Sequence, residues 1–196
     1  FRMFGTRNAT DTRSTTYSIV DGAGVHTATL QTSGDNIGDD GSYDGNDKQL
    51  AEITGIQADS TGTVDFRMII ASGGFAYLGL MEIIEGDAAT PLEDAARTLR
   101  IDFGRSDGTN GNLTASPDAN GAYWNNLSSA FNVADGQNSG DMVTTQNVPS
   151  GISITMQGTS WEANGRNNGG LKAPNGPNPA LLGGLAVESA TEDYYF

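Results

Sequence analysis

The sequence predicts an all-β protein, namely a β-sandwich of the jelly-roll type with one short helix. Three observations support this fold class. Short runs of alternating apolar and polar residues recur along the 196 residues, and this period of two is typical of strands with one buried face. Gly is abundant, at 27 residues, and separates these runs together with Asn, Asp, Ser and Thr, the residues that form tight turns. Only one segment carries the signals that start a helix.

The clearest strand is residues 62–70, in which every second side chain is apolar: Val64, Phe66, Met68 and Ile70. Residues 75–84 are almost continuously apolar, so we expect a central strand that is buried on both faces. The other expected strands are short: residues 1–4, 15–20, 25–31, 50–53, 99–104, 151–157, 185–188 and 194–196. The second and third of these form a hairpin around the turn Asp21-Gly22-Ala23-Gly24.

The one expected helix lies in the segment that joins the two halves of the chain. Thr90 is a suitable N-cap residue, Pro91 fits the first helical position, and Glu93 completes a capping box. We therefore predict a helix of about two turns over residues 91–97. The chain then divides into residues 1–84, a linker at 85–98, and residues 99–196.

Composition and charge exclude several classes of protein. The formal net charge of −14 would repel nucleic-acid phosphates, so we expect no nucleic-acid partner. No apolar run reaches the ~18 residues of a membrane-spanning helix, and we expect no membrane span. The lack of cysteine excludes a disulfide, a zinc–thiolate site and a cysteine nucleophile. The chain begins at Phe1 without an initiating Met, which indicates a fragment or a processed product.

Several stretches carry a resemblance to a known family. Leu99-Arg100-Ile101-Asp102-Phe103-Gly104, followed by Trp124-Asn125-Asn126, resembles the start of a galactose-binding-like or malectin-like β-sandwich module. Residues 1–7 and 13–19 are similar to a later strand pair of these modules, and residues 75–83 resemble their closing strand, which lies beside the opening strand. The resemblance implies an accessory module of a bacterial protein that is extracellular or on the cell surface.

The order of the segments differs from that of the family, in which residues 99–196 would precede residues 1–84. Three explanations fit: a circular permutant, a chain cut from a tandem array, or one repeat of a longer polymer, and we favour the last two. In an array, residues 1–84 of one copy would complete residues 99–196 of a neighbour. An isolated half would expose strand edges and apolar faces.

A calcium site is predicted in the acidic loop Asp40-Gly41-Ser42-Tyr43-Asp44-Gly45-Asn46-Asp47. Oxygen-bearing side chains recur at every second residue and a Gly follows the third, as in calcium-binding loops. The predicted ligands are Asp35, Asp39, Asp40, Ser42, Asp44 and Asp47. The twelfth position is Ala51 and the Glu comes next, at Glu52, so an EF-hand is rejected. The alternative is a solvated acidic turn.

A carbohydrate site is predicted around the aromatic residues of the second half, because sugar rings stack on aromatic side chains and bond to amides and guanidinium groups. The candidate contacts are Tyr123, Trp124, Asn125, Asn126, Trp161, Asn164 and Arg166. The alternative for Trp124 is a core position, with the neighbouring Asn residues forming a turn.

Catalysis is not expected. His26 is the single histidine and lies on a predicted strand, and no Gly-x-Ser-x-Gly motif accompanies it. The 24 acidic residues offer many carboxylate pairs for glycoside hydrolysis, but the sequence gives none of their separations.

Two functions remain. The first is a non-catalytic extracellular carbohydrate-binding module, stabilised by Ca²⁺, whose partner is a glycan. The second is a structural repeat of an extracellular filament or surface array, joined head-to-tail, whose partners are copies of itself. Fold alone does not decide between them.

Overall fold

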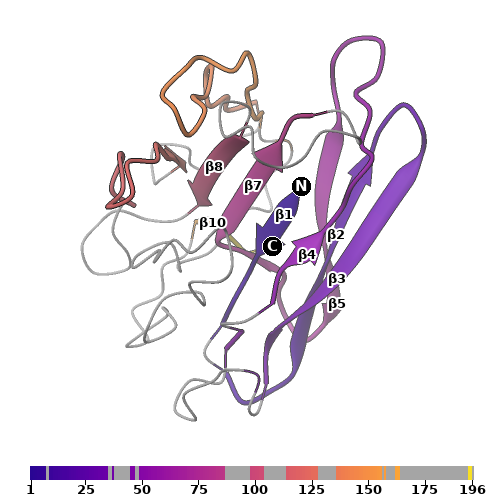
Figure 1. Cartoon of the computed structure of the whole chain (residues 1–196). Coiled ribbons are helices and arrows are strands. Elements are labelled where there is room, and N and C mark those ends of the chain that lie inside the picture. The colour runs from indigo at the N-terminus through magenta and orange to yellow at the C-terminus, as the bar shows by residue number, and fades with distance from the viewer. Residues whose placement is uncertain are drawn as a thin grey trace.

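A computed structural model of the chain shows a strand-rich molecule (Figure 1). The structure describes residues 1–7, 9–34, 37, 45–46, 49–86, 98–103, 114–127, 136–155, 157, 162–163 and 194–195. Every regular element within these residues is a strand, and none is a helix. The helix predicted at residues 91–97 and the strand predicted at 185–188 lie outside the described residues. No helix of the described part is long and apolar enough to cross a membrane.

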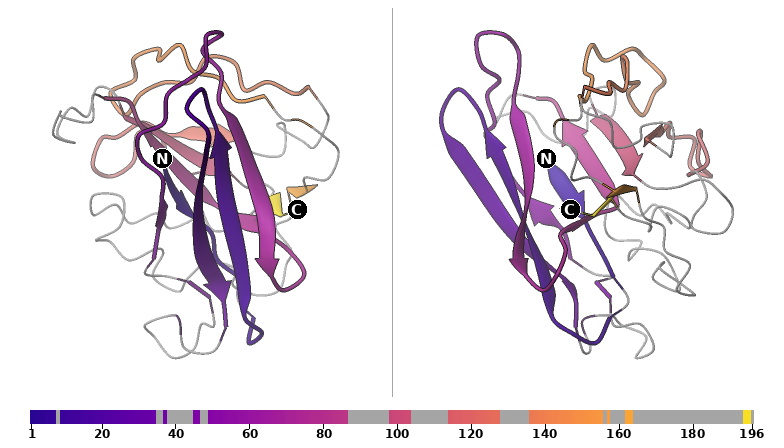
Figure 2. Two further views of the ribbon diagram at one scale, coloured as in Figure 1. Left: turned by 90° about the vertical axis from the view of Figure 1, so that its right-hand side faces the viewer. Right: turned by 180° about the vertical axis from the view of Figure 1, so that it is seen from behind.

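The strands form one five-stranded sheet and two three-stranded sheets. The second of the three-stranded sheets is the smallest, because each of its strands has only two residues. The five-stranded sheet has the order β4 (Ala51–Glu52), β1 (Arg2–Phe4), β7 (Leu80–Ile84), β8 (Thr98–Phe103) and β9 (Asn125–Leu127). The first three-stranded sheet has the order β3 (Val25–Ser33), β2 (Arg13–Val20) and β5 (Asp65–Ser72). The second has the order β10 (Glu162–Ala163), β11 (Tyr194–Tyr195) and β6 (Tyr77–Leu78). The two larger sheets face each other (Figure 2), as the prediction of a β-sandwich requires.

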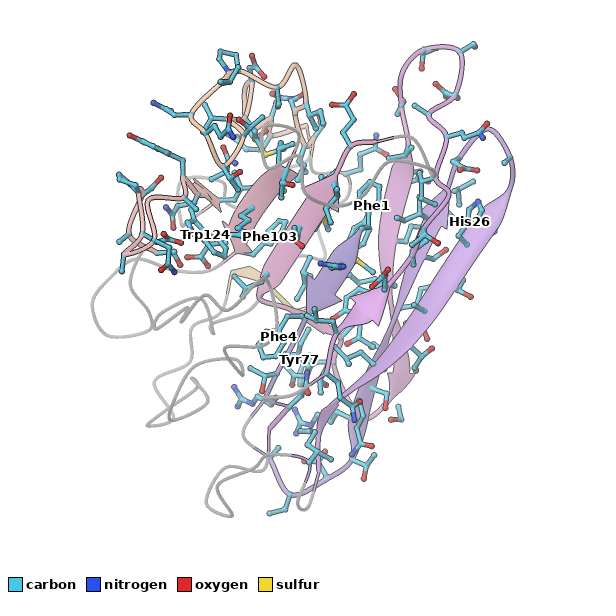
Figure 3. All side chains as sticks on the ribbon, in the orientation of Figure 1. Phe1, Phe4, His26, Tyr77, Phe103 and Trp124 are labelled. Atoms are coloured by element: carbon cyan, nitrogen blue, oxygen red, sulfur yellow. The ribbon has the colours of Figure 1, made fainter. Side chains whose placement is uncertain are left out.

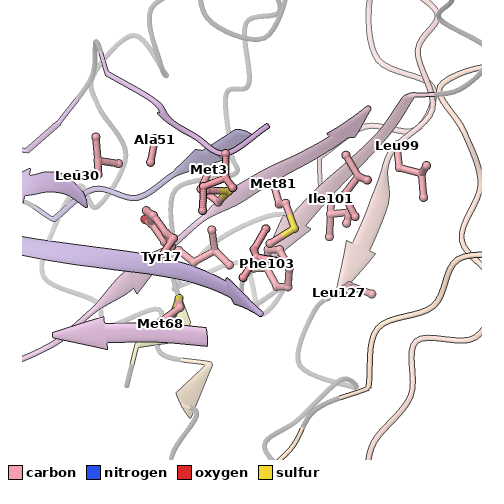
Figure 4. Close-up of a cluster of buried hydrophobic side chains, with 14 of the residues drawn as sticks. Met3, Tyr17, Leu30, Ala51, Met68, Met81, Leu99, Ile101, Phe103 and Leu127 are labelled. Atoms are coloured by element: carbon pink, nitrogen blue, oxygen red, sulfur yellow. The ribbon is translucent and has the colours of Figure 1, made fainter. Parts of the chain in front are cut away.

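The core lies between these two layers and consists of the inward-facing side chains of both (Figure 4). The three-stranded sheet β3-β2-β5 contributes Tyr17, Ile19, Leu30 and Met68. The five-stranded sheet contributes Met3, Ala51, Met81, Ile83, Leu99, Ile101, Phe103 and Leu127. On β7 and β8 these residues alternate with Glu82, Arg100 and Asp102, so the charged side chains point to the outer face of the sheet.

The predicted hairpin is confirmed: β2 and β3 pair antiparallel from Val20↔Val25 to Arg13↔Ser33. Asp21 closes its turn, because one carboxylate oxygen accepts the backbone N–H groups of Ala23 at 2.8 Å and Gly24 at 2.9 Å. The other oxygen accepts the N–H of Gln57 at 2.7 Å. These bonds to the charged form lower the pKa of Asp21 to about 2.

Residues 75–84 form two strands rather than the single one predicted. The chain changes sheets at Gly79, since β6 pairs with β11 and β7 lies between β1 and β8. The peptide groups of Gly79 stay in the hydrogen-bond pattern: its N–H donates to Phe4 O and its carbonyl accepts from Phe103 N, both at 2.8 Å. Within this run β7 is buried on both faces as predicted, whereas Phe75 is exposed.

Strands from both halves of the sequence meet in the five-stranded sheet. β7 and β8 pair antiparallel, with Met81 opposite Ile101 and Ile83 opposite Leu99. The strand predicted at residues 99–104 therefore does lie beside the one predicted at 75–84. β1 and β2 do not form a strand pair, because they belong to different sheets. One chain supplies both partners of the central β7–β8 ladder.

The apolar faces predicted for residues 151–157 and for residues 62–70 differ in how well they are buried. The strand predicted at residues 151–157 is not found in its described part, where Thr155 forms only an isolated bridge with Asn138, although Ile152 and Ile154 pack against the core and Ser153 and Thr155 are exposed as expected. In β5, however, Ile70 is 41% exposed rather than buried. It shares a face with Met68, but β5 is an edge strand and a register shift follows Ile70, so no described strand covers it.

Candidate functional site

A row of charged side chains crosses the outer face of the five-stranded sheet. The strand registers place Arg2 beside Glu52 and Glu82, and Glu82 beside Arg100. Glu82 accepts from both arginines, with Oε2 3.2 Å from Arg2 Nη1 and Oε1 3.2 Å from Arg100 Nε. Arg2 Nε also lies 3.4 Å from Glu52 Oε2. Charges of alternating sign therefore run across β4, β1, β7 and β8.

Burial differs along this row. The Glu82 side chain is 4% exposed, Arg100 is 14% exposed and Arg2 is 24% exposed. Glu52, at the edge strand β4, is 53% exposed. The buried centre of the row is thus one carboxylate between two guanidinium groups, which carries a net charge of one positive unit. With Glu52, which also pairs with Arg2, the row of four side chains carries no net charge.

Trp124 continues the row beyond β8. The Arg100 guanidinium lies over its ring, with Cζ 5.7 Å from the ring centroid, a cation–π distance. The indole N–H donates to Asp118 Oδ2 at 3.0 Å. Trp124 is only 4% exposed, so its ring presents no open face on which a sugar could stack. Figure 3 shows this residue beside β8, far from His26.

The amide groups of Asn125 and Asn126 are used to hold the backbone together. Asn125 Nδ2 donates to Arg100 O at 3.1 Å and to Val143 O at 2.8 Å, and its Oδ1 accepts from Val143 N at 2.9 Å. Asn126 forms a reciprocal pair with the backbone of Thr114. These two predicted sugar contacts therefore join β8 and β9 to neighbouring loops. Tyr123 is half-buried, and its backbone N–H donates to Thr145 O.

Asp102 lies on the same outer face, between Leu80 and Asn126 in the register. Its Oδ2 accepts the backbone N–H of Thr114 at 3.0 Å, and Asp102 makes no ion pair with any described residue. Burial raises the pKa of this carboxyl to about 6, and the bonds from Thr114 only partly offset that effect. Asp102 is a buried acid that titrates near neutral pH.

His26 lies on β3, where its Nε2 is 3.3 Å from Asp21 Oδ1. The same oxygen accepts two backbone N–H groups, so the main role of Asp21 is to stabilise the β2–β3 turn. No serine or threonine hydroxyl of the described residues bonds to His26. Within the described residues, this site therefore has no nucleophile next to its only histidine.

The remaining predicted site residues lie outside the described residues. These are the sugar contacts Trp161, Asn164 and Arg166 and the calcium ligands Asp35, Asp39, Asp40, Ser42, Asp44 and Asp47. The described residues alone contain no group of three or more His, Cys, Asp or Glu side chains that could hold a metal ion.

One end of the predicted calcium loop is described, and it is firmly attached. Asn46 is 1% exposed, and its Nδ2 donates to Gly5 O at 3.2 Å and to Gln49 O at 2.9 Å. Its Oδ1 accepts the N–H of Gln49 at 2.9 Å. Asn46 thus fixes the chain where the loop rejoins the sandwich.

Sequence reasoning missed the Arg2–Glu82–Arg100 row, although a signal was present. Each of these residues is a charged residue between two apolar neighbours, at a position that alternates with core residues. The pattern places a charge on the outer face of each strand. Only the register shows that the three charges are neighbours.

Comparison of the chain with protein-family models, with curated proteins and with solved structures found no match. The functional conclusion below therefore rests on the sequence pattern and the geometry alone.

Proposed function

We propose that this chain is a non-catalytic carbohydrate-binding module, built on a jelly-roll β-sandwich of the galactose-binding-like kind, from an extracellular or surface-attached bacterial protein. The observation that carries the proposal is the outer face of the five-stranded sheet, where Arg2, Glu82 and Arg100 form one hydrogen-bonded row beside Trp124. Guanidinium and carboxylate groups are strong, directional partners for hydroxyl groups. Within the row, Arg2 and Glu52 are the more exposed members, at 24% and 53%, and these are the groups proposed to bond to sugar hydroxyls, while the buried Glu82 holds Arg2 in place.

The proposal assigns the roles by exposure. Trp124 is buried, and the amides of Asn125 and Asn126 bond to the backbone, so these residues are assigned a structural role and not a contact with the sugar. Trp161 is the proposed stacking platform, and Tyr123, Asn164 and Arg166 are the proposed hydrogen-bonding partners. The sequence places the last two close to Trp161 in a segment rich in Asn and Gly.

The test is binding to a glycan array, followed by titration calorimetry with the best ligand. Trp161→Ala should weaken binding by ~1–3 kcal/mol, the value of one stacked ring. Phe75→Ala is the matched control, because Phe75 is an aromatic residue that is 41% exposed on another part of the chain. An absence of glycan binding at millimolar sugar, or equal losses in both variants, would contradict the proposal.

We also propose that Ca²⁺ shapes the loop that contains Asp40, Ser42, Asp44 and Asp47, with Asp35 and Asp39 as further ligands. Oxygen donors at alternate positions suit this ion. Calcium should raise the melting temperature of the wild type, and Asp44→Asn should abolish that rise. Asp65→Asn removes an exposed carboxylate on β5, outside the loop, and should leave the calcium-dependent rise in melting temperature unchanged. A melting temperature that is the same with calcium and with a chelator would contradict the proposed calcium site.

The second candidate function is a structural repeat of an extracellular filament or surface array, joined head-to-tail. The swapped order of the two sequence segments supports it, and electron microscopy of the native material tests it. Filaments or regular arrays are the expected result. Dispersed particles at all concentrations would argue against it.

A further inference from the structure

The segment from Thr114 to Asn126 folds back on itself as an irregular hairpin that is held by side chains. Asn126 forms its reciprocal pair with the backbone of Thr114 at 2.9 and 3.0 Å. Ser116 Oγ bonds to the N–H of Trp124 at 2.8 Å and to its carbonyl at 3.0 Å. We call residues 114–118 the outer arm of this hairpin. The other arm leads into β9.

The two arms are attached to β8 in different ways. β9 pairs with β8 along its whole length, from Ile101↔Asn125 to Phe103↔Leu127. Among the described residues, one hydrogen bond ties the outer arm to β8, namely that from Thr114 N to Asp102 Oδ2, at 3.0 Å. The position of the outer arm on the sheet therefore depends on the state of one carboxyl group.

This contact buries two polar groups that lack full partners. Asp102 is 5% exposed, and the next residues of its row across the sheet, Leu80 and Phe4, are both 0% exposed. Thr114 is 7% exposed, and its Oγ1 has no hydrogen-bond partner among the described residues. A buried carboxylate without a cation and a buried hydroxyl without a partner both cost free energy. Both groups gain water when the outer arm moves away from β8.

The charged groups near Asp102 are engaged elsewhere. Arg100, two residues earlier on the same face of β8, bonds to Glu82 and lies over Trp124. Glu82, on β7, is shared by two arginines. Asp118, on the outer arm, accepts the indole N–H of Trp124. β9 carries no charged residue. No cation of the described residues therefore compensates the charge of Asp102.

We propose that the contact between Asp102 and Thr114 is a pH-sensitive clamp, which holds the outer arm on β8 when Asp102 carries a proton and opens more often when Asp102 is ionised. The neutral acid tolerates burial, whereas the carboxylate favours water. The pKa of Asp102, raised to about 6 by burial, has the direction that this clamp requires. The clamp tightens in mildly acidic surroundings and loosens near neutral pH.

Hydrogen exchange of the Thr114 backbone N–H, measured by nuclear magnetic resonance on the full chain between pH 5 and pH 8, tests the clamp. The pKa of Asp102 is about 6 in the closed state and 3.8 in water, so the protection factor of this N–H should fall about tenfold over this range. At each pH, this N–H should exchange faster than the N–H groups of the central β7–β8 ladder, as a local opening requires.

Three variants separate the contributions. Asp102→Asn keeps the shape and removes the ionisation, so the protection factor at residue 114 should stay constant with pH. Asp118→Asn is the matched control, because Asp118 lies in the same hairpin and has no hydrogen bond to Thr114, and it should keep the fall with pH. Thr114→Val replaces the unpartnered hydroxyl by a methyl group and should raise the protection factor at every pH, since opening then returns no hydroxyl to water.

Three results would overturn the inference: a Thr114 N–H that exchanges as slowly as the β7–β8 ladder at every pH, a wild-type protection factor that does not change with pH, or the same change in Asp102→Asn. Glycan binding does not enter this test, so the clamp and the proposed function can fail separately.

Discussion

The Asp102 carboxylate is buried, and few neighbouring groups stabilise its negative charge. Asp102 is 5% exposed, and among the described residues its carboxylate accepts a hydrogen bond from the backbone N–H of Thr114. Because burial raises its pKa from 3.8 to about 6, the folded state holds this proton more tightly than the unfolded state. The stabilising contribution is therefore complete below pH ~4 and is lost as the pH rises through ~6.

Asp102→Asn should separate this effect from the other 23 acidic residues, because it keeps the shape and removes the charge. At pH 7.5 we expect the variant to be more stable than the wild type by up to about 3 kcal/mol, the free energy of a pKa shift of this size. At pH 4 the difference should vanish, since Asp102 is then protonated. Urea unfolding between pH 4 and 7.5 measures both. A difference that does not change with pH would contradict the argument.

Gly5 is a second residue whose role is set by space. A β-carbon at this position would contact Tyr77 O and would lie 2.7 Å from the Tyr17 hydroxyl oxygen. That hydroxyl is already committed, because it donates to Tyr77 O at 2.6 Å in the buried core. The close approach of β1 to Tyr77 therefore requires a residue without a side chain.

Gly5→Ala should destabilise the fold by about 1–3 kcal/mol, the usual cost of overpacking a core. Gly74→Ala is the control, since nothing lies within 4 Å of its added carbon, and it should change the free energy of unfolding by less than about 1 kcal/mol. Chemical denaturation of the two variants side by side gives the comparison. Equal changes would show that Gly5 is not constrained by Tyr17 and Tyr77.

At the scale of elements, β1, β7 and β8 are joined by their outward charges as well as by their backbones. Glu82 on the central strand is the shared partner, and it is almost fully buried. Removing its charge would leave two guanidinium groups next to each other without a carboxylate between them. Glu52 is the outer member of the same row and is half exposed, so water can solvate Arg2 when the Glu52 carboxylate is removed.

Glu82→Gln should therefore cost about 2–4 kcal/mol of stability, below the full value for a buried pair because both arginines retain some solvent contact. Glu52→Gln makes the same chemical change at the exposed end and should cost less than about 1 kcal/mol. Thermal unfolding at low and high salt checks that Glu82→Gln destabilises the protein more than Glu52→Gln does. Added salt should reduce the loss caused by Glu52→Gln more strongly, because that side chain is exposed to solvent. Similar losses in both variants would mean that burial does not decide the strength of this row.

Elements that depend on local pattern could be predicted from the sequence, and elements that depend on register could not. The β2–β3 hairpin followed from Asp21 to Gly24, and the buried strand β7 followed from its apolar run. The change of sheet at Gly79 was missed because an apolar run looks the same in one sheet or two. Asn125 and Asn126 were predicted as ligand contacts, since the sequence does not show that backbone groups of Val143 and Thr114 meet their amides.

At the scale of the whole molecule, both sequence segments contribute to one sheet and one core. The β7–β8 ladder joins residues 80–84 to residues 98–103, and Met81 and Ile101 lie opposite each other within the same cluster. Residues 1–84 supply strands to both layers, but without β8 and β9 the strand β7 loses a partner and the core loses Leu99, Ile101, Phe103 and Leu127. The two segments should therefore not be stable apart.

Calorimetry should show a single unfolding transition for the intact chain, with equal calorimetric and van't Hoff enthalpies. Residues 1–86 and residues 98–196, produced separately, should each lack cooperative unfolding, and mixing them should restore it in part. Two resolved transitions, or one fragment that folds alone, would show that the segments are independent bodies.

The crossing at Gly79 has a mechanical consequence. The chain leaves β6 and enters β7 within one residue, and the peptide groups of that residue remain bonded to Phe4 and Phe103. There is no slack between the small sheet and the centre of the large one. We therefore expect a displacement of Tyr77 to be passed through Gly79 to Phe4 and Phe103 in the five-stranded sheet, rather than being absorbed by a loop.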